Sequence, residues 1–198
     1  MNRSFLRFAL ARGGRPRTLA AIPVVATIAL VAAGASPAAA VPIKRGQSTV
    51  TLDQNIFSGL DPLGIGILPI APAEASSGGE SFPITGGSVS RNGQRARINH
   101  GGGIVFAGDN AEVRVVRLRG RLCCPDSELS ASVAGQRMSF LSLEGGTVTS
   151  RGRRITFRGI NASLTLEAAD ALNQAFATDF FQEGTRLGKL RIRMTLVS

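Results

Sequence analysis

The sequence contains no tryptophan, no tyrosine, a single histidine and two cysteines in 198 residues. Without tryptophan or tyrosine, only phenylalanine remains to stack on exposed bases, which argues against a nucleic-acid partner. One histidine and two adjacent cysteines do not supply a full set of nitrogen and sulfur ligands for zinc within one chain. We therefore predict neither nucleic-acid binding nor a metal site.

Sequence motifs of common enzymes are missing as well. There is no Gly-x-Ser-x-Gly elbow, phosphate loop, dinucleotide fingerprint or two-histidine metal motif. Aspartate and glutamate are scattered singly, so no carboxylate pair of the glycosidase kind can be named. We predict that the chain has no catalytic residues and is not an enzyme.

Acidic residues are absent from the first forty positions, which have the pattern of an export signal. Five arginines precede an apolar run from Leu19 to about Ala33: Arg3, Arg7, Arg12, Arg15 and Arg17. The small residues of Ser36–Ala40 suit a signal peptidase, and we predict cleavage after Ala40. The apolar run is shorter than the roughly 20 residues of a comfortable membrane span. We expect a protein that is secreted or held at the cell envelope, without a transmembrane anchor after cleavage.

Residues 41–198 would then form one domain by length. The formal net charge of +10 overstates the basicity of this domain, because five of the 23 basic residues belong to the leader and all 13 acidic residues remain. The excess that remains is five positive charges, nearly all of it arginine, since Lys44 and Lys189 are the only lysines.

Apolar residues alternate with polar ones over most of this domain, most clearly between Ser81 and Leu122. Turn residues separate short expected strands at 47–52, 65–70, 82–85, 88–90, 94–99, 103–106, 112–122, 129–133, 137–143, 147–150, 155–159, 162–166 and 190–196. The apolar phase changes near Val115 and Val116, which predicts a bulge or a strand that is buried on both sides at its start. Residues 74–80 read as a polar loop. This pattern predicts a mostly β protein, an antiparallel β-sandwich or an open barrel with one or two short helices.

Two helices are expected, each following a strand. Asp53 is suited to cap a short helix that continues to Leu60. Residues 167–176 are good helix formers, with Ala168, Ala171, Leu172 and Ala175 on one face. Because each helix begins where a strand ends, the two strand-to-helix units are expected to pack together as a cap.

The adjacent cysteines Cys123 and Cys124 precede a proline in a turn. In an oxidising compartment some disulfide is expected. Neighbouring cysteines pair only in a strained ring, so three alternatives stay open: a vicinal disulfide, a bridge between two chains, or free thiols. The oligomeric state is not determined by the sequence.

His100 stands beside three glycines, Gly101, Gly102 and Gly103. It is the one residue that could act as a ligand or transfer protons near neutral pH. Glycines allow a bound group to approach the backbone closely. The alternative is a histidine that hydrogen-bonds a turn at a strand end. Arg117 and Arg119 share a strand face and could hold carboxylates or an anionic polymer, or form a solvated outer face.

Four segments carry a resemblance to a known family: Phe82–Gly87, Ile98–Phe106, Leu164–Phe176 and Phe180–Gly188. Together they resemble secreted actinobacterial proteins with the HtaA-type haem-binding domain. The resemblance implies a β-rich module over residues 41–198 that lies outside the cell or at its surface and takes up haem. Members of that family coordinate iron through a tyrosine supported by a histidine, and this chain has no tyrosine.

Two functions follow from the resemblance. The first is a non-catalytic binding module for haem or another anionic hydrophobic ligand, with His100 as ligand, Gly101–Gly103 beside it, and Arg117 or Arg119 holding propionates. The second is a structural or adhesive protein of the cell envelope that keeps the scaffold without a small ligand. An anionic envelope polymer is its expected partner.

Overall fold

The computed structural model of the chain describes residues 40–76, 79–123 and 126–198. Antiparallel strands dominate these residues, as the alternating pattern predicts. Their bounds are β1 (Ala40–Leu52), β2 (Gly66–Ile70), β3 (Glu74–Ser76), β4 (Gly79–Ser90), β5 (Ala96–His100), β6 (Gly103–Ala107), β7 (Glu112–Leu122), β8 (Glu128–Val133), β9 (Gln136–Glu144), β10 (Thr147–Arg151), β11 (Arg154–Leu164) and β12 (Arg186–Leu196). The helices are α1 (Gln54–Leu60), a 3-10 turn η1 (Asp61–Leu63) and α2 (Leu166–Phe176). All of them belong to one compact unit.

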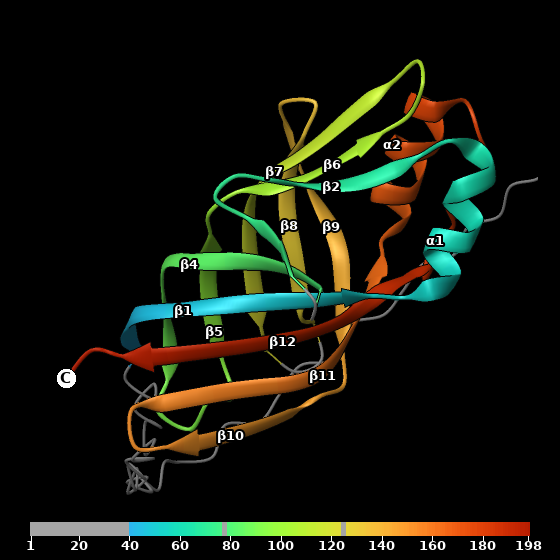
Figure 1. The fold of residues 1–198 in the computed structure, drawn as a ribbon. Helices are drawn as coiled ribbons and strands as arrows, with labels where there is room; N and C mark the ends of the chain where they lie inside the picture. Colours follow the sequence, from blue (N-terminus) through green and yellow to red (C-terminus); the bar gives the residue numbers. More distant parts are fainter. Residues whose placement is uncertain (1–39, 77–78, 124–125) are drawn as a thin grey trace, which may run out of the picture. The chain divides into compact units, whose positions relative to one another are not determined.

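Eight strands close into a barrel (Figure 1). Neighbouring strands follow the order β7, β5, β4, β1, β12, β11, β9 and β8, and β8 pairs back with β7. The prediction of a mostly β, antiparallel fold with two short helices is confirmed, and of the two named architectures the barrel is supported. Closure satisfies the backbone groups that an open sheet would leave at its edges.

The long strand β7 joins the barrel to an extra sheet. Its first half pairs with β6, as in Phe106 with Val113, and its second half pairs with β5, as in Ala96 with Leu122. Arg117 between the halves has a φ of 55°, and the register against β8 shifts between Val116 and Arg119. The predicted bulge is therefore confirmed, and it lies where the strand changes partner.

Bulges also explain where the strand predictions were wrong. The expected strands 82–85 and 88–90 are one strand, β4, irregular between Ile84 and Gly86. The expected strands at 155–159 and 162–166 merge as β11, whose register shifts after Phe157. Strict alternation over 155–159 predicts that Gly159 shares the face of Ile155 and Phe157, and this was wrong, because Gly159 is exposed. The polar loop expected at 74–80 contains β3, which pairs with β4.

Both helices begin within one residue of the predicted start. The Asp53 side chain caps α1 by accepting from Asn55 N at 3.1 Å, and Thr165 caps α2 by accepting from Ala168 N at 3.2 Å. The buried side of α2 consists of Ala168, Ala169 and Leu172, and the prediction that Ala175 lies on it was wrong. Neither described helix is long and apolar enough to cross a membrane.

The helices lie at the same end of the barrel (Figure 1). Gly59 of α1 packs so closely on the Phe180 ring that a side chain at position 59 would overlap it. Phe181 meets Phe106 edge-on, with ring centroids 6.2 Å apart, and Phe106 also contacts Phe140. The two strand-to-helix units thus pack together over this end of the barrel, as expected.

Candidate functional site

His100 is the last residue of β5, and the pleat of that strand decides where it points. Ala96, Ile98 and His100 are buried, while Arg97 and Asn99 between them are exposed. His100 therefore belongs to the row that faces the barrel interior, and only 8% of it is accessible to solvent. The chain's one histidine is an interior side chain and does not lie on the surface of a turn.

A hydroxyl group meets the imidazole inside the barrel. Ser48 Oγ of β1 lies 2.7 Å from His100 Nε2, and Ser48 is itself buried. Either the hydroxyl donates to Nε2 or a protonated Nε2 donates to the hydroxyl, depending on the tautomer. The contact spans β4, which lies between β1 and β5 in the barrel. It ties together two strands that are 52 residues apart in sequence.

Burial sets the charge of the imidazole. Desolvation lowers the pKa of His100 to about 4. A hydrogen bond with the Leu118 backbone raises this pKa, but by less than desolvation lowers it. The ring is therefore neutral at physiological pH. Its Nδ1 atom is buried, and the hydrogen bond between the ring and the Leu118 backbone does not have normal geometry. The interior therefore holds a neutral imidazole that pairs with Ser48 through Nε2.

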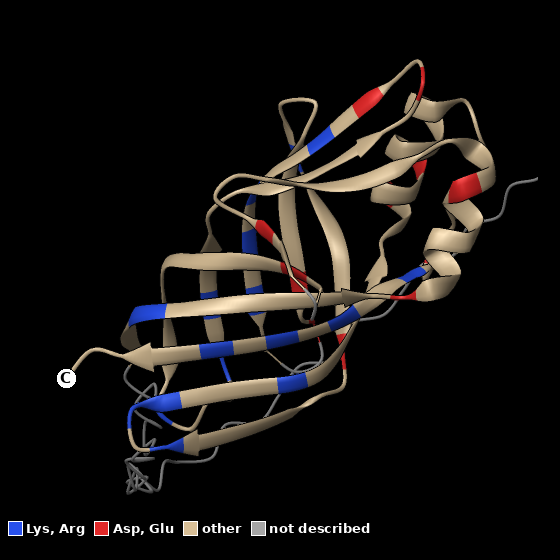
Figure 2. Cartoon of the chain, viewed as in Figure 1, with Lys and Arg blue, Asp and Glu red and all other residues tan. Residues whose placement is uncertain are grey.

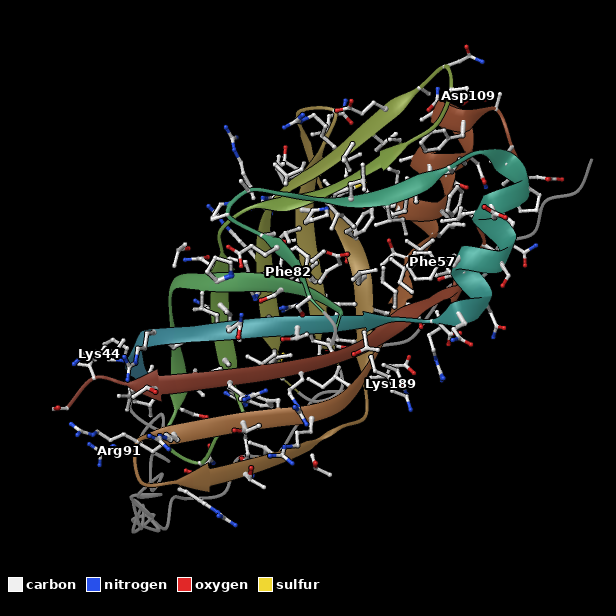
Figure 3. The ribbon with its side chains drawn as sticks, viewed as in Figure 1. Lys44, Phe57, Phe82, Arg91, Asp109 and Lys189 are labelled. Atoms are coloured by element: carbon white, nitrogen blue, oxygen red, sulfur yellow. The ribbon has the colours of Figure 1, made fainter. Side chains whose placement is uncertain are left out.

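A small cavity of about 50 Å³ adjoins the imidazole. Its lining is apolar except for Ser48, His100 and Glu80. Apolar side chains from seven barrel strands surround these three, and Phe82 of β4 is labelled among them in Figure 3. The volume suits one or two water molecules or a small group.

Glu80 contributes an unsatisfied polar atom. Its Oε2 is buried without a hydrogen-bond partner, and desolvation raises the pKa of this carboxyl. Buried polar atoms without partners destabilise a fold by about 1–3 kcal/mol each. The cavity that retains this Glu80 atom beside a buried imidazole is therefore the natural candidate for a binding site.

The triple glycine has its own structural reason. Gly102 has a φ of 80°, and a Cβ atom there would lie 2.5 Å from Ala73 N and from Ile70 O. A Cβ on Gly103 would lie 2.3 Å from Val115 O, and one on Gly101 would lie 3.0 Å from the Pro72 ring. The chain itself occupies the space beside all three glycines. They allow β5 to turn into β6 under the segment that joins β2 to β3.

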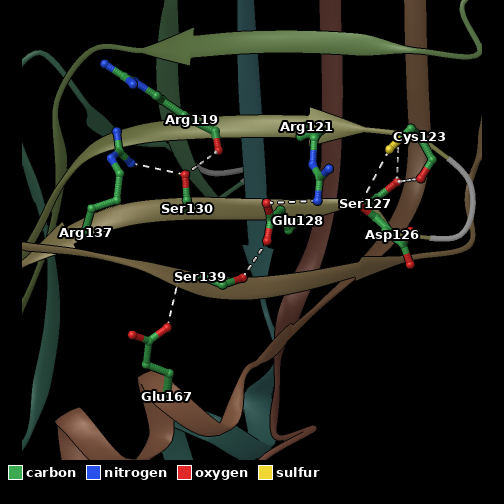
Figure 4. A network of polar contacts seen from close by, with 10 residues as sticks. All are labelled: Arg119, Arg121, Cys123, Asp126, Ser127, Glu128, Ser130, Arg137, Ser139 and Glu167. Atoms are coloured by element: carbon green, nitrogen blue, oxygen red, sulfur yellow. Dashed lines mark hydrogen bonds and ion pairs between the residues drawn. The ribbon is translucent and has the colours of Figure 1, made fainter.

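Arg117 and Arg119 lie on the other side of the barrel wall from His100. Both are exposed on the outer face of β7, whereas Leu118 between them faces inward. Figure 4 shows Arg119 beside Arg137, whose guanidinium donates to Ser130 Oγ at 3.1 Å and to Arg117 O at 3.1 Å. Burial and the two neighbouring arginines lower the pKa of Arg137. The structure does not bring these arginines together with His100 around one ligand.

The cysteine turn is partly described. Cys123 N donates to Ser127 Oγ at 2.9 Å, and that hydroxyl donates back to Cys123 O at 2.8 Å (Figure 4). Cys124 lies outside the described residues, so the three alternatives for the two thiols stay open. In the part of the chain that the structure describes, no three His, Cys, Asp or Glu side chains gather to hold a metal ion.

Ser48 and Glu80 are the two site residues that the sequence predictions missed. A signal for Ser48 was present: in the alternation of 47–52 it shares a face with Val50 and Leu52. A serine on an apolar strand face is a candidate for a buried hydrogen bond. Glu80 had no such signal, because it was placed in a loop and its burial depends on the extension of β4.

The architecture has counterparts among solved structures. The C-terminal domain of HtaA from Corynebacterium glutamicum matches at 16% identity over 79% of this chain and 99% of that one, with a TM-score of 0.59. This chain has the fold of the HtaA domains. The N-terminal domain of HtaA matches with a TM-score of 0.61 at 12% identity, over 79% of this chain and 99% of that domain.

A third match is the haem-binding protein HtaB of the same organism, with a TM-score of 0.51 at 12% identity, over 80% of this chain and 96% of HtaB. No protein-family model matches the sequence, and no curated protein matches it. The resemblance stated from the sequence is confirmed for the fold.

Proposed function

We propose that this chain is a non-catalytic binding module of HtaA-like fold, with haem as its ligand and His100 as the residue that meets it. One observation carries the proposal: the barrel interior holds a buried, neutral imidazole that lines a cavity. Neutral imidazole is a common ligand of haem iron. The fold shared with HtaB supports haem over other ligands.

The site fits haem in its chemistry and not in its size. Pockets that hold ligands of drug size measure about 300–1,000 Å³, whereas the cavity beside His100 measures about 50 Å³. A porphyrin ring therefore needs the strands or the helical cap to move apart. Arg117 and Arg119 face outward, so propionates would need other partners than the ones the sequence suggested.

The small volume favours a second candidate, a structural or adhesive protein without a small ligand. In that case the pair of Ser48 and His100 is an interior hydrogen bond that joins β1 to β5. For both candidates we propose a location outside the cytoplasm, supported by the leader pattern of residues 1–40.

Haem titration of the full chain, followed at the Soret band, tests the proposal. We expect a saturable spectral change, and we expect His100→Ala to weaken it at least about tenfold, which is about 1.4 kcal/mol. Asn99→Ala is the matched control, because Asn99 is the adjacent residue on the exposed face. No saturable change in the native chain would refute haem binding and leave the second candidate. An equal titration of His100→Ala and the native chain would remove His100 as the ligand.

A further inference from the structure

A second feature, a group of exposed arginines, lies on the outer surface and differs chemically from the apolar interior cavity. Four neighbouring strands, β1, β12, β11 and β10, present exposed arginines on their outward side. We call this the basic face and define it by six of them: Arg45, Arg151, Arg154, Arg158, Arg191 and Arg193. Figure 2 shows blue segments on these strands, with no red segment among the arginines.

The strand register arranges the basic face in rows. Arg45 is opposite Thr195, Thr195 is opposite Arg154, and Arg154 is opposite Arg151. The next row contains Gln47, Arg193, Thr156 and Thr149. Strands lie about 4.8 Å apart, and alternate residues of one strand are roughly 6.7 Å apart. Neighbouring positive charges therefore stand roughly 5–10 Å from one another.

The arginines of the basic face are not neutralised by carboxylates. The two ion pairs between described residues, Arg114 with Glu112 and Arg121 with Glu128, both involve β7. Threonine or glutamine stands between most of the arginines across the strands, which limits the repulsion of like charges placed directly opposite. The face keeps a concentrated positive charge that needs an external counter-charge.

The long side chains enclose a groove on this face. Three adjoining hollows of about 860, 430 and 370 Å³ cross it. The first two share Arg45 and Arg154, and the last two share Gln47 and Arg193, so the hollows are continuous. Glu74 stands at the far end of the groove, beyond Arg193. The groove is long, polar and open, which suits a chain-like ligand better than a compact one.

We propose that the basic face binds an acidic polysaccharide. Arginine holds carboxylate and similar anions through two parallel hydrogen bonds, and the threonine and glutamine side chains between the arginines can bond to sugar hydroxyl groups. Met194 and Leu196, the apolar residues that border the groove, are buried at 3% and 7% exposure, so the face offers nothing to insert into a lipid layer. No aromatic side chain lines the groove to stack on a nucleic-acid base.

This inference goes beyond the haem proposal, because it concerns the outer surface of the barrel and shares no residue with the interior site. The haem proposal and the polysaccharide proposal can therefore be refuted independently of each other. A chain that binds polysaccharide and not haem would satisfy this proposal alone, and a chain that binds haem only would satisfy the other.

Binding of the full chain to immobilised polygalacturonate, with neutral dextran as the reference, tests the proposal. We expect saturable binding to polygalacturonate only. It should weaken strongly between about 0.1 M and about 1 M salt, as the Debye length falls from about 10 to about 3 Å. The variant R151Q/R154Q/R193Q should bind at least about tenfold more weakly.

The matched control is R97Q/R114Q/R119Q, which removes the same charge from exposed positions on β5 and β7. It should bind within about twofold of the native chain. An equal loss in both variants would show that only net charge acts and would overturn the proposal. So would tighter binding to single-stranded DNA or to anionic phospholipid vesicles than to polygalacturonate, or no binding to polygalacturonate at all.

Discussion

At the scale of single residues, His100 shows how burial decides chemistry. The same imidazole on a surface turn would titrate near pH 6.5, whereas inside the barrel its pKa falls to about 4. The neutral ring hydrogen-bonds Ser48 through Nε2 and lies against the Leu118 backbone. Its depressed pKa also links the stability of the fold to pH.

We predict that the free energy of unfolding decreases as the pH falls from about 6.5 to about 4. In this window the histidine of the unfolded chain binds a proton and that of the folded chain does not. The pKa difference between about 6.5 and about 4 corresponds to roughly 3 kcal/mol over the window. Urea unfolding at several pH values, for the native chain and for His100→Leu, measures it.

Glu80 acts in the opposite direction, because its raised pKa favours the folded state at low pH and this contribution is lost as the pH rises. It is present in both proteins, so the difference between them isolates His100. Parallel pH profiles for the native chain and His100→Leu would contradict the prediction.

Gly102 tests the packing explanation of the triple glycine. Gly102→Ala and Gly135→Ala both place a side chain at positive φ, 80° and 85°, which costs about 1–2 kcal/mol. Only at position 102 would the new Cβ also collide with the backbone, since nothing lies within 4 Å of position 135. We expect Gly102→Ala to lower the free energy of unfolding by at least about 2 kcal/mol more than Gly135→Ala. Similar denaturation midpoints for the two variants would refute the collision.

At the scale of elements, the segment after α2 is held by a side chain of the helix. Asn173 accepts from Phe181 N at 3.0 Å and donates to Phe181 O at 2.7 Å. This pair of bonds replaces a strand partner for the Phe181 backbone and directs its ring onto Phe106. The helical cap thus depends on the Asn173 side-chain amide, which makes the two hydrogen bonds that the backbone of a neighbouring strand would make.

We predict that Asn173→Ala destabilises the fold by about 2–3 kcal/mol, because it removes two hydrogen bonds and leaves buried backbone groups unpaired. Gln174→Ala, one residue further on the exposed side of α2, should change stability by less than about 0.5 kcal/mol. Chemical denaturation of both variants makes the comparison. A loss of the same size in Gln174→Ala would show that general helix propensity, and not the Asn173 bonds, is responsible.

At the scale of the whole molecule, closing the barrel places each strand residue either in the interior or on the outer surface. Apolar side chains and the pair of Ser48 and His100 face inward, and arginines on β1, β10, β11 and β12 face outward. Because these arginines have no carboxylate partners in the described ion pairs, the folded state concentrates like charges that the unfolded chain separates.

Salt should therefore stabilise this protein. We predict that the midpoint of thermal unfolding rises by roughly 2–4 °C between about 0.01 M and about 0.15 M salt, the shift expected for about 1 kcal/mol in a chain of this size. The variant R151Q/R154Q/R193Q should show a smaller rise than R97Q/R114Q/R119Q. A midpoint that is independent of salt would show that repulsion on the basic face is negligible.

Local sequence patterns predicted most strands, both helices, the cap at Asp53 and the bulge in β7, because these features depend on neighbours close in sequence. The cap at Thr165 was not predicted. Pattern alone did not show that β8 closes on β7, that 74–76 pairs with β4, or that Gly159 is lifted out by a bulge. Those features depend on register between distant segments.

For the candidate site, too, some features could be predicted from the sequence and others depended on the tertiary structure. The sequence by itself determined that His100 is the one histidine, that glycines follow it and that no tyrosine accompanies it. Only the tertiary structure decided that Ser48, Glu80 and His100 line one cavity inside the barrel while Arg117 and Arg119 lie outside. The reason is geometric: successive residues of a strand face opposite sides of a sheet, and closing the sheet turns those sides into an interior and a surface.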